Sequence, residues 1–154
     1  MLQLPEINQA IQTDPAGYVR ACDAAYYEQI QSVAEDIVCS GQHIIFLAGP
    51  SSSGKTTTAQ AIASALSALG IRCHAISMDD YYLDVTEADY PRNERGEIDL
   101  ESPLCLDVDL FNRQMEALHD GAQVELPHFD FTTRRRDRLL RRPLQLGAEE
   151  AVIV

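Results

Sequence analysis

GPSSSGKT, at residues 49–56, is the stretch of sequence that decides the fold. It matches G-x-x-x-x-G-K-[ST], the phosphate-binding loop, at every defined position. The apolar run at residues 43–48 (HIIFLA) predicts a short buried strand before the loop, and residues 57–69 follow with helical spacing. A strand, a glycine turn and a helix in that order aim several backbone N–H groups and the positive end of the helix dipole at one point. The sequence therefore predicts a site for a polyphosphate.

The loop combines backbone donors with two side chains that have specific tasks. Lys55 would place a positive charge on the outer phosphates, and the Thr56 hydroxyl would ligate magnesium. Lys55 is also the only lysine of the chain, since all other Lys and Arg positions hold arginine. We therefore expect the loop to bind the phosphates of a nucleotide together with Mg²⁺. The candidate nucleotide-binding residues are Gly49, Ser51, Ser52, Ser53, Gly54, Lys55, Thr56 and Thr57.

Composition narrows the classes of partner. The chain has 154 residues and a formal net charge of −12, and such an acidic surface repels nucleic acid and anionic membranes. No apolar run approaches the ~20 residues of a membrane span, and the N-terminus lacks the basic and apolar regions of a signal peptide. The four cysteines form no C-x-x-C pair, which favours buried thiols in a reducing compartment. We expect a soluble, cytoplasmic protein that binds neither nucleic acid nor membranes.

The pattern divides the chain into an N-terminal helical segment, residues 1–42, and a core, residues 43–154. In the first part, Asp14 and a proline at position 15 read as the cap and first residue of a helix, and Gly41 reads as its stop. We expect this helix to pack beside the first strand. Its apolar stripe consists of Tyr18, Cys22, Tyr26, Ile30, Val33 and Ile37.

After the loop, a helix ending near Gly70 leads into a second strand at residues 72–78. Strand, helix and strand in this order predict a parallel crossover, with the two strands as neighbours. The second strand ends in DDYY, residues 79–82. Ligands of an open parallel sheet bind beyond the carboxyl ends of its strands, so these residues should face the same crevice as Lys55. The buried face of the intervening helix is expected to hold Ala59, Ile62, Leu66 and Leu69.

The remaining chain alternates irregular and regular segments. Residues 83–106 have no sustained period and predict a long functional loop. Short strands are expected at residues 124–126 and, as an edge strand, 139–146. Residues 151–154 resemble the start of a buried core strand, so we expect a chain that is truncated at its C-terminus. A helix between the loop at residues 83–106 and the strand at residues 124–126 is predicted from its cap, Asp107, and from its apolar face. This face consists of Val108, Phe111, Met115 and Leu118.

Basic side chains are concentrated in one segment. Six of the twelve Lys and Arg residues lie at positions 134–142, where Asp137 is the single acid. On an otherwise acidic chain this segment predicts either a local anion site or a solvated, partner-facing loop, and the sequence does not choose between them.

Missing motifs narrow the class of phosphate-binding protein. N-K-x-D, a D-x-x-G after the loop and G-x-G-x-x-G are all absent, which leaves small-molecule kinases and generic ATPases. A kinase needs a group that orients the acceptor hydroxyl beside the γ-phosphate. Asp79, at the tip of the second strand, is the best candidate, and its alternative role is to hold magnesium through water. Asp80 is interpreted as a cap of the turn.

Four blocks in order, GPSSSGKTT at 49–57, ISMDDYY at 76–82, GEIDLESP at 96–103 and PHFDF at 127–131, resemble the uridine kinase and phosphoribulokinase-like family. The resemblance covers residues 44–154. It implies a three-layer α/β fold of the P-loop NTPase type with a mostly parallel sheet. It also implies transfer of the γ-phosphoryl group of ATP or GTP to the 5′-hydroxyl of uridine or cytidine.

The resemblance further implies roles for individual residues. Asp79 matches the catalytic aspartate, with Lys55 assisting, and Tyr82 matches a tyrosine that contacts the nucleoside. Three substrate positions differ in residue type from the family, which points to another base or to a phosphorylated sugar. Glu101 stands where the family has a ribose-binding aspartate, Phe129 where it has a base-stacking tyrosine, and Arg134 where it has a base-contacting histidine.

Several alternatives remain open at this stage. Tyr82 and Phe129 could belong to the core, and Glu101 could be a solvated loop acid. Family members continue past the final strand into a lid helix with arginines, so this chain is expected to bind nucleotide weakly and turn over poorly. The acceptor could be a nucleoside or a sugar, or the chain could be a non-catalytic nucleotide-binding module. An exposed sheet edge would favour a homo-oligomer.

Overall fold

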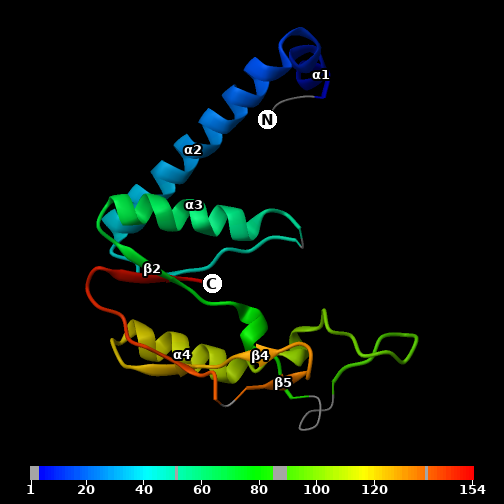
Figure 1. Ribbon diagram of the computed structural model, residues 1–154, viewed down its shortest axis with the longest axis vertical. Coiled ribbons are helices and arrows are strands. Elements are labelled where there is room, and N and C mark those ends of the chain that lie inside the picture. Colours follow the sequence, from blue (N-terminus) through cyan, green and yellow to red (C-terminus); the bar gives the residue numbers. More distant parts are fainter. Residues whose placement is uncertain (1–3, 51, 85–89, 138) are drawn as a thin grey trace.

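The computed structural model describes residues 4–50, 52–84, 90–137 and 139–154, and it has three layers (Figure 1). A parallel sheet lies in the middle, with α2 and α3 on one face and α4 on the other. This arrangement confirms the predicted α/β fold with a parallel sheet. The main elements are α1 (Leu4–Thr13), α2 (Pro15–Ser40), β1 (Ile44–Ile45), α3 (Lys55–Ala68), β2 (Arg72–Ala75), α4 (Val108–His119) and β7 (Glu150–Ile153).

The central sheet has the strand order β1-β7-β2, with both pairs parallel. The expectation that β1 and β2 are neighbours is therefore wrong, because β7 lies between them. β7 takes this place because Ala151, Val152 and Ile153 are buried and need cover on both faces. Pairing continues beyond β1, since the Leu47 N–H donates to the Val154 carbonyl at 2.9 Å. The strands predicted at residues 43–48 and 72–78 are shorter in the structure, at Ile44–Ile45 and Arg72–Ala75.

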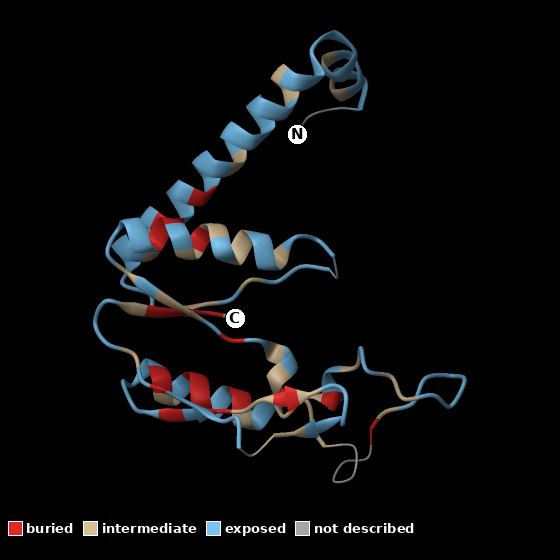
Figure 2. Ribbon diagram, in the orientation of Figure 1, coloured by how far each residue is buried: buried red, intermediate tan, exposed pale blue. Residues whose placement is uncertain are grey.

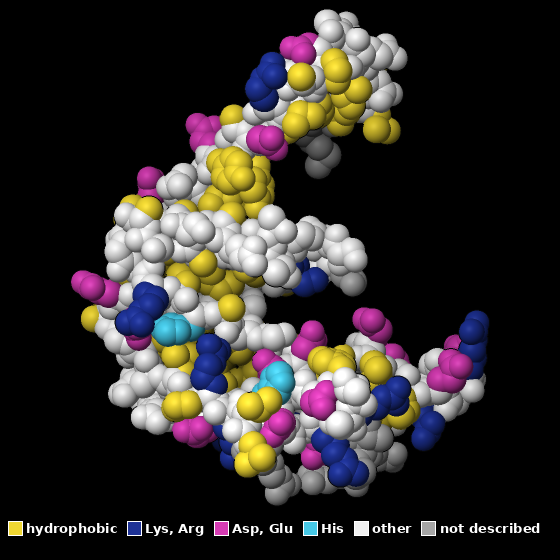
Figure 3. All heavy atoms as spheres, in the orientation of Figure 1, with side chains coloured by type: hydrophobic (Ala, Val, Ile, Leu, Met, Phe, Trp, Pro, Cys, Tyr) yellow, Lys and Arg dark blue, Asp and Glu magenta, His cyan; other side chains and the backbone are white. Residues whose placement is uncertain are grey.

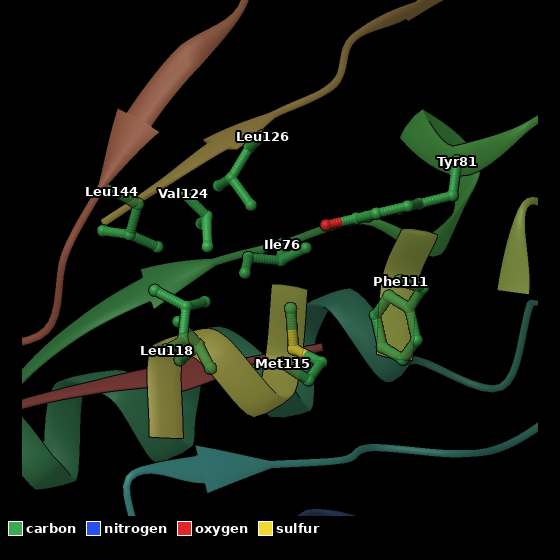
Figure 4. Close-up of a cluster of buried hydrophobic side chains, with 9 residues drawn as sticks. Ile76, Tyr81, Phe111, Met115, Leu118, Val124, Leu126 and Leu144 are labelled. Carbon is green, nitrogen blue, oxygen red and sulfur yellow. The ribbon is translucent and has the colours of Figure 1, made fainter. Parts of the chain in front are cut away.

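Successive side chains of β7 point to opposite faces of the sheet, so this strand contributes to both halves of the core. Val152 belongs to the cluster on the α4 side (Figure 4), and Ile153 to the cluster with α2 and α3. Figure 2 shows the buried residues gathered on the inward faces of these helices and on the sheet. The predicted helix face of α3 is correct at Ile62 and Leu66, whereas Leu69 is 43% exposed. On α4, Phe111, Met115 and Leu118 are buried as predicted, and Val108 is exposed.

The N-terminal helices form an arm that projects from the sheet layers (Figure 1). The predicted caps of α2 are confirmed, because the Asp14 carboxylate accepts the Gly17 N–H at 2.8 Å and Gly41 adopts a φ of 64°. Only the C-terminal half of α2 reaches the core, where Ile30 and Ala34 pack on α3 and near β1. Val33, expected in the core, is exposed. The division of the chain at residues 42 and 43 stays a prediction.

Two small antiparallel pairs and two 3₁₀ turns complete the α4 side. The predicted strand at residues 124–126 is confirmed as β3, and the edge strand expected at 139–146 is confined to β6. These elements are η1 (Met78–Tyr81), η2 (Pro103–Cys105), β3 (Val124–Leu126) paired with β6 (Arg142–Leu144), and β4 (Phe129–Asp130) paired with β5 (Arg135–Arg136). Among the described residues, no helix combines the length and apolar character needed to cross a bilayer.

Candidate functional site

The loop between β1 and α3 turns sharply at its glycines. Gly54 has a φ of 84°, a left-handed conformation that costs another residue roughly 1–2 kcal/mol. A Cβ on Gly49 would lie 2.9 Å from Ser53 Oγ, so the lack of a side chain at Gly49 allows the start of the loop to approach Ser53. Ser52 also has a positive φ, of 59°. The candidate ligand Ser51 lies outside the described residues.

Lys55 is the first residue of α3 and folds back over the loop. Its Nζ donates to the carbonyls of Gly49 and Pro50, at 2.8 Å each. These contacts hold the ammonium group across the loop in front of the N-terminus of α3, where backbone N–H groups have no intrahelical partner. Thr56 and Thr57 follow in the first helical turn and are exposed. Lys55 and Thr56 both line the cavity beside the loop, so one cation, one hydroxyl and the positive end of the helix dipole face the same space.

A cavity of about 700 Å³ opens beside the loop. Its wall includes Lys55 and Thr56 from α3, Asp79 from η1, and Ile153 and Val154 at the end of β7. Figure 3 shows this side of the molecule hollowed between the α3 layer and the part below it. Although β7 separates their strands, the structure thus brings Lys55, Thr56 and Asp79 to one crevice at the carboxyl ends of the strands, where parallel sheets bind ligands.

The turn η1 presents Asp79 to this cavity. Ser77 Oγ caps the turn by accepting the Asp79 N–H at 3.2 Å, which corrects the interpretation of Asp80 as the cap. Asp79 is exposed, and within the part of the chain that the structure describes its carboxylate has no hydrogen bond or ion pair. On the other side of the turn, Tyr81 is fully buried and its hydroxyl donates to Gln114 Oε1 at 2.8 Å. Burial, reinforced by the nearby Asp80, raises the pKa of Tyr81 to about 12.

Three aromatic rings pack together next to Asp79. Ring centroids lie 5.4 Å apart for Tyr82 and Phe129, 5.5 Å for Tyr82 and Phe131, and 5.0 Å for Phe129 and Phe131. Phe129 is only 5% exposed, whereas Phe131 is 54% exposed and offers its ring to solvent. Tyr82 and Phe129 were predicted from the sequence as substrate-binding residues, and Phe131 was not. The signal was available, because residues 129 and 131 of an extended segment lie on the same face.

Arg136 connects three parts of this region, and sequence reasoning did not distinguish it from the other arginines. Its guanidinium donates to the carbonyls of Tyr81 and Tyr82, at 3.0 and 2.9 Å, and to the carboxylate of Asp107 at 2.9 Å. Burial alone would raise the pKa of Asp107. The hydrogen bonds from the Leu110 N–H and from Arg136 outweigh burial and hold that pKa below its ordinary value. Arg136 thereby fixes the carbonyl end of η1 to the cap of α4.

The other predicted substrate residues lie around the same edge. Glu101 is exposed, and its N–H donates to Asp99 Oδ1 at 3.2 Å. Burial raises the pKa of Tyr82, and the negative charges of Asp79 and Glu101 are among the further causes. The Tyr82 hydroxyl donates to the Leu100 carbonyl at 2.8 Å. Arg134 is exposed in the turn between β4 and β5, with a φ of 53°.

Comparison with known proteins gives the family. A profile of the Phosphoribulokinase / Uridine kinase family matches residues 44–154. The chain belongs to the phosphoribulokinase/uridine kinase family. The resemblance drawn from the four sequence blocks is thus confirmed.

Two relatives illustrate the match within the family. The chain is 38% identical over 107 residues to the uridine kinase of Chloroflexus aurantiacus, a match that covers 67% of this chain and 49% of that protein. It is 34% identical over 113 residues to the uridine kinase of Lactobacillus helveticus, covering 72% and 52% respectively. The chain spans about half the length of these curated relatives.

Solved structures show the same fold. A possible uridine kinase from Bacillus stearothermophilus superimposes with a TM-score of 0.62 and 24% identity, covering 82% of this chain and 68% of that one. A putative fructose transport system kinase from Silicibacter sp. TM1040 gives a TM-score of 0.60 and 22% identity, with 80% and 61% covered. Both support the P-loop kinase architecture of this family member.

The donor set of the loop suits magnesium. Among the described residues, no group of three or more His, Cys, Asp and Glu side chains is placed to hold a metal by itself. Magnesium does not need such a cage, because it binds through one or two protein oxygens, water and the phosphates of its nucleotide. The hydroxyl of Thr56 and the carboxylate of Asp79 line the same cavity and are oxygen donors of this kind. The site therefore fits a magnesium–nucleotide complex.

Proposed function

We propose that this protein transfers the γ-phosphoryl group of ATP or GTP to a hydroxyl of a small acceptor, and that the acceptor is a nucleoside such as uridine or cytidine. The observation that carries the proposal is the placement of Lys55, Thr56 and Asp79 on the wall of one cavity. Membership of the phosphoribulokinase/uridine kinase family supports the reaction class.

The loop residues bind and orient the donor. Backbone N–H groups at Gly49, Ser52, Ser53 and Gly54 would bind the phosphates, and the N-terminus of α3 would add its dipole. Lys55 exchanges its contacts with the carbonyls of Gly49 and Pro50 for phosphate oxygens, so it is already held at the mouth of the loop. Thr56 would ligate Mg²⁺, which neutralises charge between the outer phosphates. Thr57 follows Thr56 in the first turn of α3.

Asp79 acts on the acceptor. A carboxylate that accepts a hydrogen bond from the acceptor hydroxyl aligns its oxygen with the γ-phosphorus and receives the proton late in the transfer. Its carboxylate is exposed and has no partner among the residues with described positions, so it is free to make this contact. Its alternative role, holding magnesium through water, uses the same position. If Asp79 aligns the acceptor, its loss should mainly lower turnover. If Asp79 holds magnesium through water, its loss should mainly change how the rate depends on the magnesium concentration.

The aromatic rings favour a nucleoside over a sugar phosphate. A base can stack on the exposed ring of Phe131, which rests on Tyr82 and Phe129. Base–aromatic stacking contributes about 1–3 kcal/mol per base. Glu101, whose charge contributes to the raised pKa of Tyr82, would accept hydrogen bonds from ribose hydroxyls, and Arg134 lies in the turn between β4 and β5. The second candidate is a sugar kinase. The observation that favours it is a pair of neighbouring exposed arginines, Arg134 and Arg135, which could bind an acceptor phosphate.

A phosphoryl-transfer assay tests the proposal. We would measure ADP release with Mg·ATP and a panel of uridine, cytidine, other nucleosides, sugars and sugar phosphates. Lys55→Met and Asp79→Asn should each lower turnover by about 10²–10⁴-fold. The matched control is Asp23→Asn on the exposed part of α2, which should leave turnover unchanged. Because slow turnover is expected of this chain, acceptor binding is measured as well. Nucleotide binding with neither binding of any acceptor on the panel nor acceptor-stimulated turnover would contradict the enzyme and favour a non-catalytic binding module.

A further inference from the structure

A side-chain link joins the turn that carries Asp79 to the strand that carries Phe129. Asp80 Oδ1 accepts a hydrogen bond from the Phe129 N–H at 3.2 Å and contacts His128 Nδ1 at 3.0 Å. We propose that Asp80 and His128 are positioning residues that set the acceptor against the catalytic carboxylate. This inference rests on the proposed function, because it assigns no reaction of its own.

The link joins the two elements that carry the proposed acceptor residues. Asp80 is the direct neighbour of Asp79 in η1, and His128 directly precedes Phe129 in β4. The two donors come from consecutive residues and converge on one oxygen, so they fix both the distance and the register of η1 against β4. Any shift along β4 breaks at least one of the two bonds, since hydrogen bonds weaken steeply with misalignment.

The consequence of a shift follows from what each element carries. η1 and the residue after it hold Asp79 and Tyr82, and β4 holds Phe129, whose ring lies 5.4 Å from that of Tyr82. An acceptor seated on the aromatic rings is therefore placed relative to Asp79 through this link. Displacement of about 1 Å between reacting groups can cost about 10²-fold in rate. Among the described residues, the hydrogen bonds of the Asp80 side chain go to His128 and Phe129, and the cavity wall that includes Gly49, Lys55 and Thr56 does not include Asp80 or His128.

The solvent exposure of Asp80 and His128 indicates that their contact contributes little to the stability of the fold. The side chain of Asp80 is 33% exposed and that of His128 is 45% exposed. Partly exposed charge pairs contribute little to folding, typically about 0–1 kcal/mol. Arg136 already fixes the carbonyl end of η1 to α4. Loss of the link should therefore change the alignment of the acceptor more than the stability of the fold.

Four variants test the proposal against Asp23→Ala as the control. Asp80→Ala removes the acceptor oxygen, and His128→Ala removes one donor. Asp80→Asn keeps a δ oxygen, and His128→Asn keeps an N–H donor at the δ position, as His Nδ1 does. We would measure kcat and KM for the acceptor and for Mg·ATP separately, and melting temperature as a check on folding.

We expect Asp80→Ala to lower kcat/KM for the acceptor about tenfold or more and His128→Ala to lower it about three- to tenfold. The two Asn variants should recover most of this loss, with KM for Mg·ATP within about twofold throughout. Unchanged acceptor kinetics in the Ala variants, or a parallel loss of Mg·ATP affinity, would overturn the positioning role. If Asp80→Ala does not fold, the contrast between His128→Ala and His128→Asn decides.

Amide exchange at Phe129 distinguishes failure of the inference from failure of the proposed function. The Phe129 N–H donates to Asp80, so its exchange should accelerate in Asp80→Ala and stay slow in Asp80→Asn. This readout needs no turnover. Loss of protection with unchanged acceptor binding overturns the inference and leaves the kinase intact. Absence of both acceptor binding and acceptor-stimulated turnover in the parent chain contradicts the function, and uridine binding that ignores Asp80→Ala contradicts the link.

Discussion

Arg136→Met should destabilise the protein strongly, because it removes a cation that holds three acceptors. The variant keeps an apolar stem of similar length and loses the bonds to the Tyr81 and Tyr82 carbonyls and to Asp107. The side chains of Arg136 and Asp107 are 22% and 24% exposed, so water replaces these bonds only in part. Hydrogen bonds to charged groups contribute about 1.5–3 kcal/mol each and are not additive. Since Asp107 keeps its bond from the Leu110 N–H, we expect a total loss of about 2–4 kcal/mol.

The assay is urea unfolding at pH 7 and at a series of acidic pH values. The folded-state pKa of Asp107 is lowered from 3.8, so its stabilisation is present above that value and is lost as pH falls through the folded-state pKa. Arg136→Met should lose part of this dependence, and the stability difference between the two proteins should narrow in acid. Arg20→Met, on the exposed face of α2, is the control and should change stability by less than about 0.5 kcal/mol. A loss below about 1 kcal/mol for Arg136→Met at pH 7, or a difference independent of pH, would refute this reasoning.

Three further predictions concern the core, the loop and the acceptor edge. Tyr81→Phe should cost about 1–2 kcal/mol in urea unfolding, because it leaves Gln114 Oε1 without its donor. The raised pKa of Tyr81 favours the folded state below the ordinary value of 10.0, and this advantage is lost as pH rises through about 12. In an absorbance titration, the tyrosine that ionises last should therefore be missing from Tyr81→Phe. Gly49→Ala should weaken Mg·ATP binding about tenfold or more by calorimetry, because Ser53 must move; unchanged affinity would show that the loop tolerates the methyl group. Phe131→Ala should raise KM for a nucleoside about tenfold with KM for Mg·ATP unchanged, and equal effects on both would place this ring outside the acceptor site.

Local features of the fold were readable from the sequence. The phosphate loop, the caps of α2 and the buried face of α4 depend on residues a few positions apart, so spacing and residue type are enough. The helix α1 was missed although Leu4, Ile7 and Ile11 stand at helical spacing. None of its residues is buried, so the segment carries a helical period without the core contacts that usually accompany one.

Features that depend on distant partners were not readable. Nothing in the local pattern of β7 shows that it enters between β1 and β2, because strand order is set by which apolar surfaces need cover. Arg136 looks like its neighbours in sequence, and only the fold brings the carbonyls of Tyr81 and Tyr82 to it. The same holds for Asp80, whose partners lie in β4. The roles of Asp79, Tyr82 and Glu101 stay predictions, although the structure places them around one edge.

The central position of β7 has a consequence for biosynthesis. β1 and β2 share no ladder and are joined only through β7, which is made much later on the ribosome than either of them. Until residues 150–153 emerge, the backbone N–H and C=O groups at the facing edges of both early strands lack their ladder partner, and the sheet that supports the phosphate loop is not formed. The nascent chain should therefore acquire nucleotide affinity abruptly, at the length where this strand leaves the exit tunnel, and should be vulnerable to proteases and chaperone capture before then.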